Sequence, residues 1–153
     1  AEAVLPAWVG LDRSEAALQV ARANAAALGL PVRFQALDLL ALTAESAFQH
    51  LDLLVSNPPY VPVAERPQLA PHVLREPAEA LFADPPLLFY ERLAALGQAW
   101  LRPGGALLME VHAPLATAVA GYYRRAGWQS VQLLPDSFAR PRFVWAQPPG
   151  ANL

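Results

Sequence analysis

Short apolar runs alternate with helical patterns along this chain, and that alternation restricts its fold more than any other feature. The runs that favour strands cover residues 8–11, 32–37, 51–56 and 106–111. The patterns that favour helices cover residues 14–28, 86–101 and 114–126. Strands separated by helices are typical of βαβ units, which form parallel sheets covered by helices. The sequence therefore predicts an α/β fold.

Local signals set the expected ends of several elements. Ser14 can cap the first helix and Gly29 can end it. Pro103-Gly104-Gly105 is expected to end the second helix. Two late runs, residues 130–134 and 142–146, are expected to form strands that pair antiparallel to each other. We thus expect a mostly parallel sheet with an antiparallel late strand.

The composition limits the kind of protein. A chain of 153 residues with 55% hydrophobic residues suits one domain, and we expect a single domain over residues 1–153. The sequence contains no run of 18 apolar residues, so it predicts no membrane span. The absence of cysteine fits a cytoplasmic protein. The net charge of −2 counts against nucleic acid as a partner. His50, His72 and His112 lack the spacing of metal ligands, so we expect them at the surface or at helix ends.

The expected strand over residues 51–56 leads directly into Asn57-Pro58-Pro59-Tyr60. Each proline fixes its own φ near about −65° and keeps the preceding residue extended, so this segment is stiff. The carbonyls of Asn57 and Pro58 can then accept hydrogen bonds from an NH₂ group of a ligand, and Tyr60 can lie against a planar group. The alternative is an ordinary exit from a strand, for which Asn-Pro and Pro-Pro are common signals.

Polar residues follow three successive predicted strands: Asp12, Asp38 and Asn57. Ligands of open α/β sheets bind outside the carboxyl ends of the strands, so these residues are candidates for one site. Asp12 can accept hydrogen bonds from ribose hydroxyls, or it can cap the helix at Ser14. Asp38 can accept a hydrogen bond from an amine, or it can be a turn aspartate.

The segment Ser56-Asn57-Pro58-Pro59-Tyr60-Val61 resembles the signature of amino-group methyltransferases that use S-adenosylmethionine. Further segments make the chain similar, from about residue 7 to residue 147, to the HemK-type protein-glutamine N5-methyltransferases. Enzymes of that family modify the glutamine of the GGQ motif in peptide chain release factors. The segments are Leu74-Arg75-Glu76-Pro77, Ala80-Leu81-Phe82-Ala83, Phe89-Tyr90-Glu91-Arg92-Leu93, Leu101-Arg102-Pro103-Gly104-Gly105 and Arg140-Pro141-Arg142-Phe143-Val144. The chain departs from the family at Ala83-Asp84-Pro85-Pro86, where glycines are usual, so the resemblance does not fix the conformation of this loop.

The resemblance implies a Rossmann-like class I methyltransferase sheet, S-adenosylmethionine as the cofactor, S-adenosylhomocysteine as its product, and no metal. It implies a release factor with its GGQ-containing domain as the protein substrate, without a membrane partner. The cofactor-binding residues that it implies are Asp12, Arg13, Asp38, Leu39 and Asn57. The residues that it implies around the methyl acceptor are Asn57, Pro58, Pro59 and Tyr60, with Glu76 and Tyr90 as candidates behind them. Glu110 ends a predicted strand, and the alternative for all three is a structural role, such as a salt bridge in a loop or helix packing.

The family also has a strand and a Gly-x-Gly-x-Gly turn ahead of the position of Trp8, where this chain has only seven residues. We therefore expect a partial catalytic domain without the first strand and the glycine-rich loop, which alone binds S-adenosylmethionine weakly or not at all. Two alternatives stay open. One is an amino methyltransferase that acts on adenine or guanine in DNA or RNA, and the other is a non-catalytic fragment or interaction module.

Overall fold

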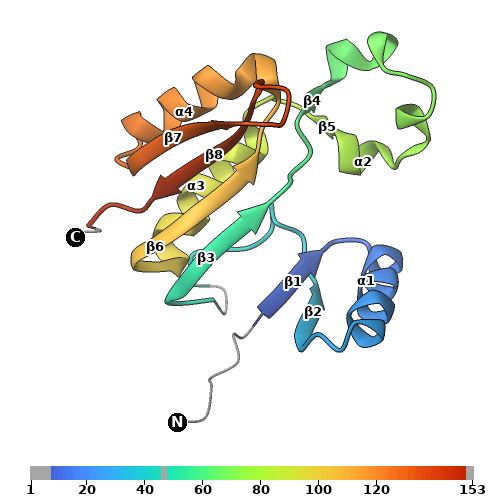
Figure 1. The fold of residues 1–153 in the computed structure, drawn as a ribbon, viewed down its shortest axis with the longest axis horizontal. Helices are drawn as coiled ribbons and strands as arrows, with labels where there is room; N and C mark the ends of the chain where they lie inside the picture. Colours follow the sequence, from blue (N-terminus) through green and yellow to red (C-terminus); the bar gives the residue numbers. More distant parts are fainter. Residues whose placement is uncertain (1–7, 46–47, 151–153) are drawn as a thin grey trace. The chain divides into compact units, whose positions relative to one another are not determined.

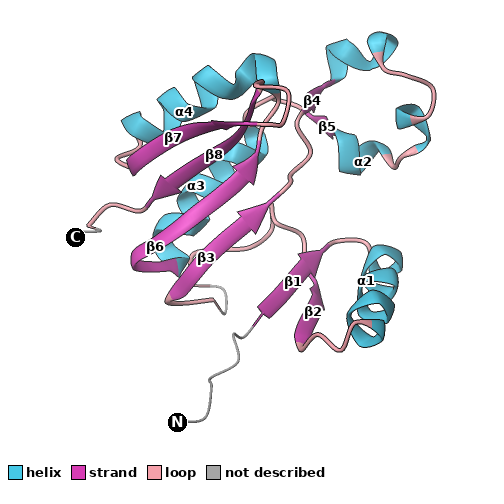
Figure 2. Ribbon diagram, in the orientation of Figure 1, coloured by secondary structure: helices cyan, strands magenta, loops and turns pink. Residues whose placement is uncertain are grey.

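The computed structural model describes residues 8–45 and 48–150, and it confirms the alternation of strands and helices (Figures 1 and 2). By its internal contacts the chain divides into two compact units, residues 1–42 and 43–153. Each unit is described by itself. None of the helices that the structure describes reaches the length and apolarity needed to span a membrane.

The first unit is a βαβ arrangement. Its elements are β1 (Trp8–Asp12), α1 (Glu15–Ala27) and β2 (Val32–Ala36). The two strands pair in parallel, with Asp12 opposite Ala36. Ser14 caps α1 because its hydroxyl accepts a hydrogen bond from the Ala17 N–H at 3.3 Å. Gly29 follows the helix with φ +65°, which a residue without Cβ adopts easily, so both predicted helix ends are confirmed.

The second unit contains a mixed sheet in the order β3-β6-β8-β7. Its strands are β3 (Leu51–Ser56), β6 (Leu101–Glu110), β7 (Gln129–Pro135) and β8 (Pro141–Gln147). β3 and β6 run parallel, whereas β8 runs antiparallel to β6 and to β7. The predicted antiparallel pair of late strands is therefore confirmed.

Strand β6 begins earlier than the sequence predicts. We expected the segment 103–105 to separate a helix from a strand, but Leu101 already pairs with Leu51 of β3. An irregularity in the register follows between Leu51 and Leu53. Gly105 permits this close approach, since a Cβ atom there would lie only 2.8 Å from the carbonyl oxygen of Leu51. The prediction was wrong because it treated these glycines as a helix stop rather than as part of a strand.

Two helices cover one face of this sheet (Figure 2): α3 (Leu88–Trp100) and α4 (Ala116–Arg125), which the short 3₁₀ helix η3 (Ala113–Leu115) precedes. The core combines apolar residues of both helices with alternate residues of β6 and β8. Its members include Tyr90, Leu93, Leu96, Trp100, Leu107, Met109, Val119, Tyr123, Val144 and Ala146. The alternation in the strands directs these residues to the face that the helices cover.

The long segment between β3 and α3 is built from short elements. They are β4 (Val61–Pro62), η1 (Val63–Gln68), η2 (Val73–Arg75), α2 (Ala78–Leu81) and β5 (Phe82–Ala83). β4 pairs with β5 in parallel, so the two ends of the segment lie side by side. The loop at residues 83–86, which the sequence left open, contains a cis peptide bond between Asp84 and Pro85.

Strand β3 is the end strand of its sheet, and no strand in the described part of the chain pairs with its outer edge. Two alternate residues of this strand, Leu53 and Val55, are 37% and 58% exposed. Among the described residues, β3 is thus an edge strand of its sheet without a strand partner on its outer side, and it carries exposed apolar side chains.

Candidate active site

The tetrapeptide Asn57-Pro58-Pro59-Tyr60 leaves the sheet at the carboxyl end of β3. Pro58 is buried, Pro59 and Tyr60 are half-buried, and Asn57 is exposed. The buried ring of Pro58 anchors the segment, because it fills a packed position and has one fixed backbone dihedral. The exposed side chain of Asn57 can therefore reach a ligand from a stiff support.

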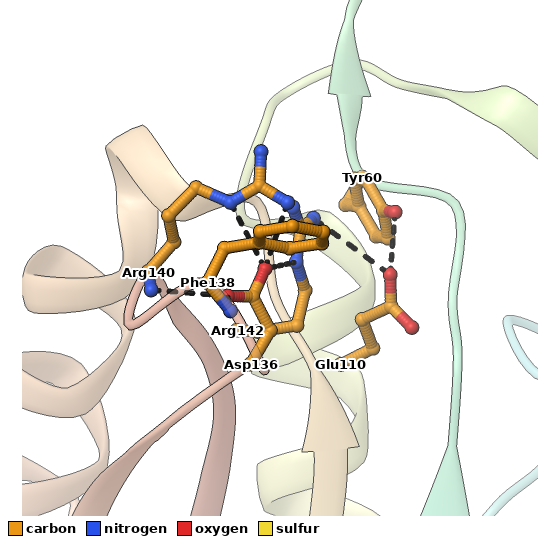
Figure 3. A network of polar contacts seen from close by, with 6 residues as sticks. All are labelled: Tyr60, Glu110, Asp136, Phe138, Arg140 and Arg142. Atoms are coloured by element: carbon orange, nitrogen blue, oxygen red, sulfur yellow. Dashed lines mark hydrogen bonds and ion pairs between the residues drawn. The ribbon is translucent and has the colours of Figure 1, made fainter.

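Tyr60 is held by three contacts. Its N–H donates to the carbonyl oxygen of Leu81 at 3.2 Å, and its hydroxyl donates to Oε1 of Glu110 at 2.7 Å (Figure 3). Its ring stacks on His112, with 5.9 Å between the centroids and 17° between the planes. Burial and the carboxylate of Glu110 raise the pKa of Tyr60 to about 12. The hydroxyl therefore stays protonated at neutral pH and remains a donor.

Glu110 connects Tyr60 to the hairpin formed by β7 and β8. Arg142 Nη1 lies 3.8 Å from Oε1 of Glu110, and Arg142 Nε lies 3.8 Å from Oδ2 of Asp136. Figure 3 shows these contacts running from Tyr60 through Glu110 and Arg142 to Asp136. Charges of alternating sign thus extend from the candidate site to the turn of the hairpin.

Asp136 organises that turn. Its Oδ1 accepts hydrogen bonds from the N–H groups of Phe138 at 2.9 Å and Arg140 at 3.0 Å, and its Oδ2 accepts one from Arg140 Nε at 3.0 Å. Burial acts to raise the pKa of Asp136, but the hydrogen bonds from Arg140 and Phe138 outweigh it, so the pKa lies below its usual value. The carboxylate stays ionised and keeps the turn in one shape.

The sequence missed the contacts of His112. His112 precedes η3, as expected of a histidine at a helix end, but its Nε2 lies 3.0 Å from a carboxylate oxygen of Glu65. Its N–H donates to the Tyr90 hydroxyl at 3.1 Å, and burial raises the pKa of Tyr90. One signal was present: Glu110 and His112 are two residues apart in extended chain, a spacing that places side chains on the same side.

The candidates behind the tetrapeptide have different surroundings. Glu110 accepts the hydroxyl of Tyr60 directly. Tyr90 is one contact further away, because its hydroxyl accepts the N–H of His112, whose ring stacks on Tyr60. Glu76 follows η2 and is exposed. In the described part of the chain, no three His, Cys, Asp or Glu side chains are arranged to hold a metal ion.

The candidate cofactor residues of unit 1 lie at the ends of its two strands. Asp12 ends β1, and its Oδ1 accepts a hydrogen bond from the Ser14 N–H at 2.8 Å. Asp38 follows β2, and its Oδ1 accepts one from the Leu40 N–H at 2.9 Å. These are the local roles that the sequence raised as alternatives, although a carboxylate has a second oxygen that can accept from a ligand. Arg13 is exposed and Leu39 is half-buried.

An α/β fold with a stiff Asn-Pro-Pro-Tyr segment at a strand end defines a class of methyl-transferring proteins, and the comparison with known families agrees. A family model described as the methyltransferase small domain matches residues 5–95. The chain belongs to this family. The matched region includes every candidate residue from Asp12 to Tyr60 and crosses the boundary between the two units.

Two curated relatives share 43% identity with the chain, and both are named release factor glutamine methyltransferase. The relative from Deinococcus radiodurans aligns over 140 residues, which is 91% of this chain and 49% of the relative. The relative from Cereibacter sphaeroides aligns over 147 residues, 94% of this chain and 51% of the relative. The chain thus spans about half the length of the curated relatives it matches.

A solved structure, that of a ribosomal protein L11 methylase from Lactobacillus delbrueckii subsp. bulgaricus, matches with a TM-score of 0.63. The match covers 94% of this chain and 58% of the methylase, at 14% sequence identity. At that identity the likeness concerns the fold alone, which is an α/β fold with a mixed sheet.

Proposed function

We propose that this chain carries part of the catalytic domain of a cytoplasmic release factor glutamine methyltransferase. The reaction transfers a methyl group from S-adenosylmethionine to the side-chain amide nitrogen of a glutamine in a peptide chain release factor. The observation that carries the proposal is the stiff segment after β3, with an exposed Asn57 and a Tyr60 held at its backbone, ring and hydroxyl. The names of the two relatives support it.

We also propose that residues 1–153 belong to one domain, because the family match over residues 5–95 includes parts of both units. Within it, Asp12, Arg13, Asp38, Leu39 and Asn57 would hold the cofactor. Exposed carboxylates at the ends of two adjacent parallel strands suit ribose hydroxyls and an exocyclic amine, both of which are hydrogen-bond donors. When bound, S-adenosylmethionine supplies an electrophilic methyl group on a sulfonium.

The four residues of the tetrapeptide would hold the acceptor amide. The carbonyl oxygens of Asn57 and Pro58 accept both N–H bonds of the glutamine side chain, which draws electron density onto a nitrogen that is otherwise a poor nucleophile. The same bonds fix the direction of that nitrogen, and good orientation can contribute about 7–11 kcal/mol. The nitrogen loses its proton only after methylation, so the mechanism needs no general base among these residues.

The test measures transfer of radiolabelled methyl groups to a release factor. It uses the 153-residue chain alone and the chain joined to the part of the Deinococcus radiodurans relative that the alignment leaves out, because the chain aligns with only 49% of that relative. We expect the joined protein to label the GGQ glutamine, and Asn57→Ala to reduce kcat at least 100-fold. Asn24→Ala, a matched change at an exposed position of α1, should leave kcat unchanged.

Two results would contradict the proposal. The first is methyl label in DNA or rRNA while the release factor stays unlabelled, which would favour a nucleic acid amino methyltransferase. The second is an Asn57→Ala variant that is as active as the Asn24→Ala control. A release factor whose GGQ glutamine is changed to alanine gives the background of the assay.

A further inference from the structure

The hydroxyl of Tyr60 makes a short polar contact in the candidate site. Its distance to Glu110 Oε1 is 2.7 Å, and the acceptor is a carboxylate oxygen. A hydrogen bond to a charged acceptor is roughly twice as strong as one between neutral groups. The site is partly buried, so water competes for this contact less than it would at the surface. Glu110 is therefore the residue that fixes the outer end of the Tyr60 side chain.

Strand pairing explains why Glu110 lies at this place. β6 runs parallel to β3, and Met109 of β6 is opposite Ser56, the last residue of β3. The next residue of β6 is Glu110, and its carboxylate accepts the hydroxyl of Tyr60, the last residue of the tetrapeptide that follows Ser56. The Val111 N–H then donates to the carbonyl oxygen of Arg142 at 2.8 Å, which keeps β8 beside the same point.

Arg142 in turn limits the freedom of Glu110. The side chains of Glu110 and Arg142 are 27% and 23% exposed, so their attraction at 3.8 Å is screened less than that of a surface pair. On its other side Arg142 faces Asp136, which is 14% exposed and fixed by the turn of the hairpin. The carboxylate of Glu110 is thus held from the hairpin while it accepts the Tyr60 hydroxyl.

We propose that Glu110 is a positioning residue: it fixes the Tyr60 side chain, and through it the orientation of the Asn57–Tyr60 segment toward its acceptor group. The inference rests on the proposed function for the nature of that acceptor, a planar amide. Without the contact to Glu110, the Tyr60 hydroxyl would lose its carboxylate acceptor, and the side chain would be held by His112, the backbone and the neighbouring Arg142. The acceptor would then be presented in several orientations instead of one.

A substitution that keeps the shape of the residue separates positioning from packing. Glu110→Gln retains the size of the residue, but it replaces the charged acceptor by a neutral one and so weakens the hydrogen bond from the Tyr60 hydroxyl. The titration of Tyr60 reports the contact directly, because the carboxylate of Glu110 disfavours the phenolate. Asp52→Asn is the matched control, since Asp52 pairs with Arg102 at the opposite end of the same two strands.

The experiment labels the 153-residue chain with 3-fluorotyrosine and follows each tyrosine by ¹⁹F NMR against pH. Tyr60→Phe identifies the signal of Tyr60. In Glu110→Gln the titration midpoint of Tyr60 should fall by about one pH unit, as expected for removal of a nearby like charge. In Asp52→Asn the titration midpoint of Tyr60 should not move measurably, because Asp52 pairs with Arg102 and not with Tyr60. An unchanged midpoint in Glu110→Gln overturns the inference.

Kinetics then test the effect of Glu110 on methyl transfer. They use the 153-residue chain or the joined protein, whichever transfers methyl groups. Glu110→Gln should lower kcat by about 10–100-fold without changing the KM for S-adenosylmethionine. If Glu110 acts through Tyr60, the double variant should lose no more activity than Tyr60→Phe alone. A kcat for Glu110→Gln within twofold of the unsubstituted protein, or additive losses in the double variant, overturns the inference. If the unsubstituted protein methylates no release factor, the proposed function fails, while the NMR titration still decides whether the carboxylate of Glu110 acts on the Tyr60 hydroxyl.

Discussion

Gly105 provides a sharp test of how β3 and β6 are joined. A Cβ atom built on Gly105 would meet three carbonyl oxygens, those of Leu51 at 2.8 Å, Arg102 at 3.0 Å and Asp52 at 3.3 Å. All three are backbone atoms, which cannot rotate away as the end of a side chain can. Carbon and oxygen atoms normally approach to about 3.3–3.6 Å, so Gly105→Ala must move the strands apart by about 0.5 Å.

The cost of that movement follows from known overpacking effects. Forcing an extra methyl group into a packed interior costs about 1–3 kcal/mol. Alanine also restricts the unfolded chain and returns about 0.4–1 kcal/mol. We therefore expect Gly105→Ala to lower the free energy of unfolding of unit 2 by about 1–2 kcal/mol.

Gly121→Ala is the matched control. Gly121 lies inside α4, and a Cβ there would meet only Nη1 of Arg125 at 3.2 Å, the far end of a flexible side chain. Alanine favours a helix over glycine, so this variant should gain about 0.5–1 kcal/mol. Urea unfolding followed by tryptophan fluorescence measures both changes, because Trp100, Trp128 and Trp145 all belong to unit 2. If Gly105→Ala is as stable as Gly121→Ala, the close approach of the two strands is wrong.

Three further predictions concern contacts around the core and the candidate site. The pKa of Tyr60 is raised from 10.0 to about 12, so the stabilisation by its protonated hydroxyl is complete below pH 10 and is lost as the pH rises to about 12. Urea unfolding at pH 9.5 and 11.5 should therefore show a smaller fall in the free energy of unfolding for Tyr60→Phe than for the unsubstituted chain. An equal fall in both proteins contradicts this prediction. Tyr123→Phe removes the buried hydrogen bond to the Tyr90 carbonyl at 2.9 Å and should cost about 1–2 kcal/mol in urea unfolding; a cost below about 0.3 kcal/mol would show that the bond is unimportant. Asp52→Asn breaks an ion pair whose aspartate side chain is 79% exposed, so the free energy of unfolding should change by about 0.5 kcal/mol or less, and a larger loss would mean that this pair is not screened by solvent.

Much of the fold could be predicted because its signals are local. The cap at Ser14, the stop at Gly29 and the alternation of apolar runs each depend on a few neighbouring residues. The start of β6 could not be predicted in this way. Its first residues become a strand because Leu101 pairs with Leu51, and nothing near Leu101 in the sequence indicates that partner.

The site shows the same division. The position of Asn57–Tyr60 after a strand follows from the sequence, because the apolar run and the prolines are adjacent. The partner of Tyr60 does not, since Glu110 lies 50 residues away and meets it only through the register of β3 and β6. The contact of Arg142 with Glu110 likewise requires the pairing of β6 with β8.

The outer edge of β3, which has no strand partner among the described residues, has a practical consequence for anyone who purifies this chain. Open backbone groups beside Leu53 and Val55 favour aggregation, so yield and shelf life should depend steeply on concentration. A Val55→Lys variant, with a charge of the kind that natural edge strands carry, should precipitate at a higher protein concentration than the unsubstituted chain.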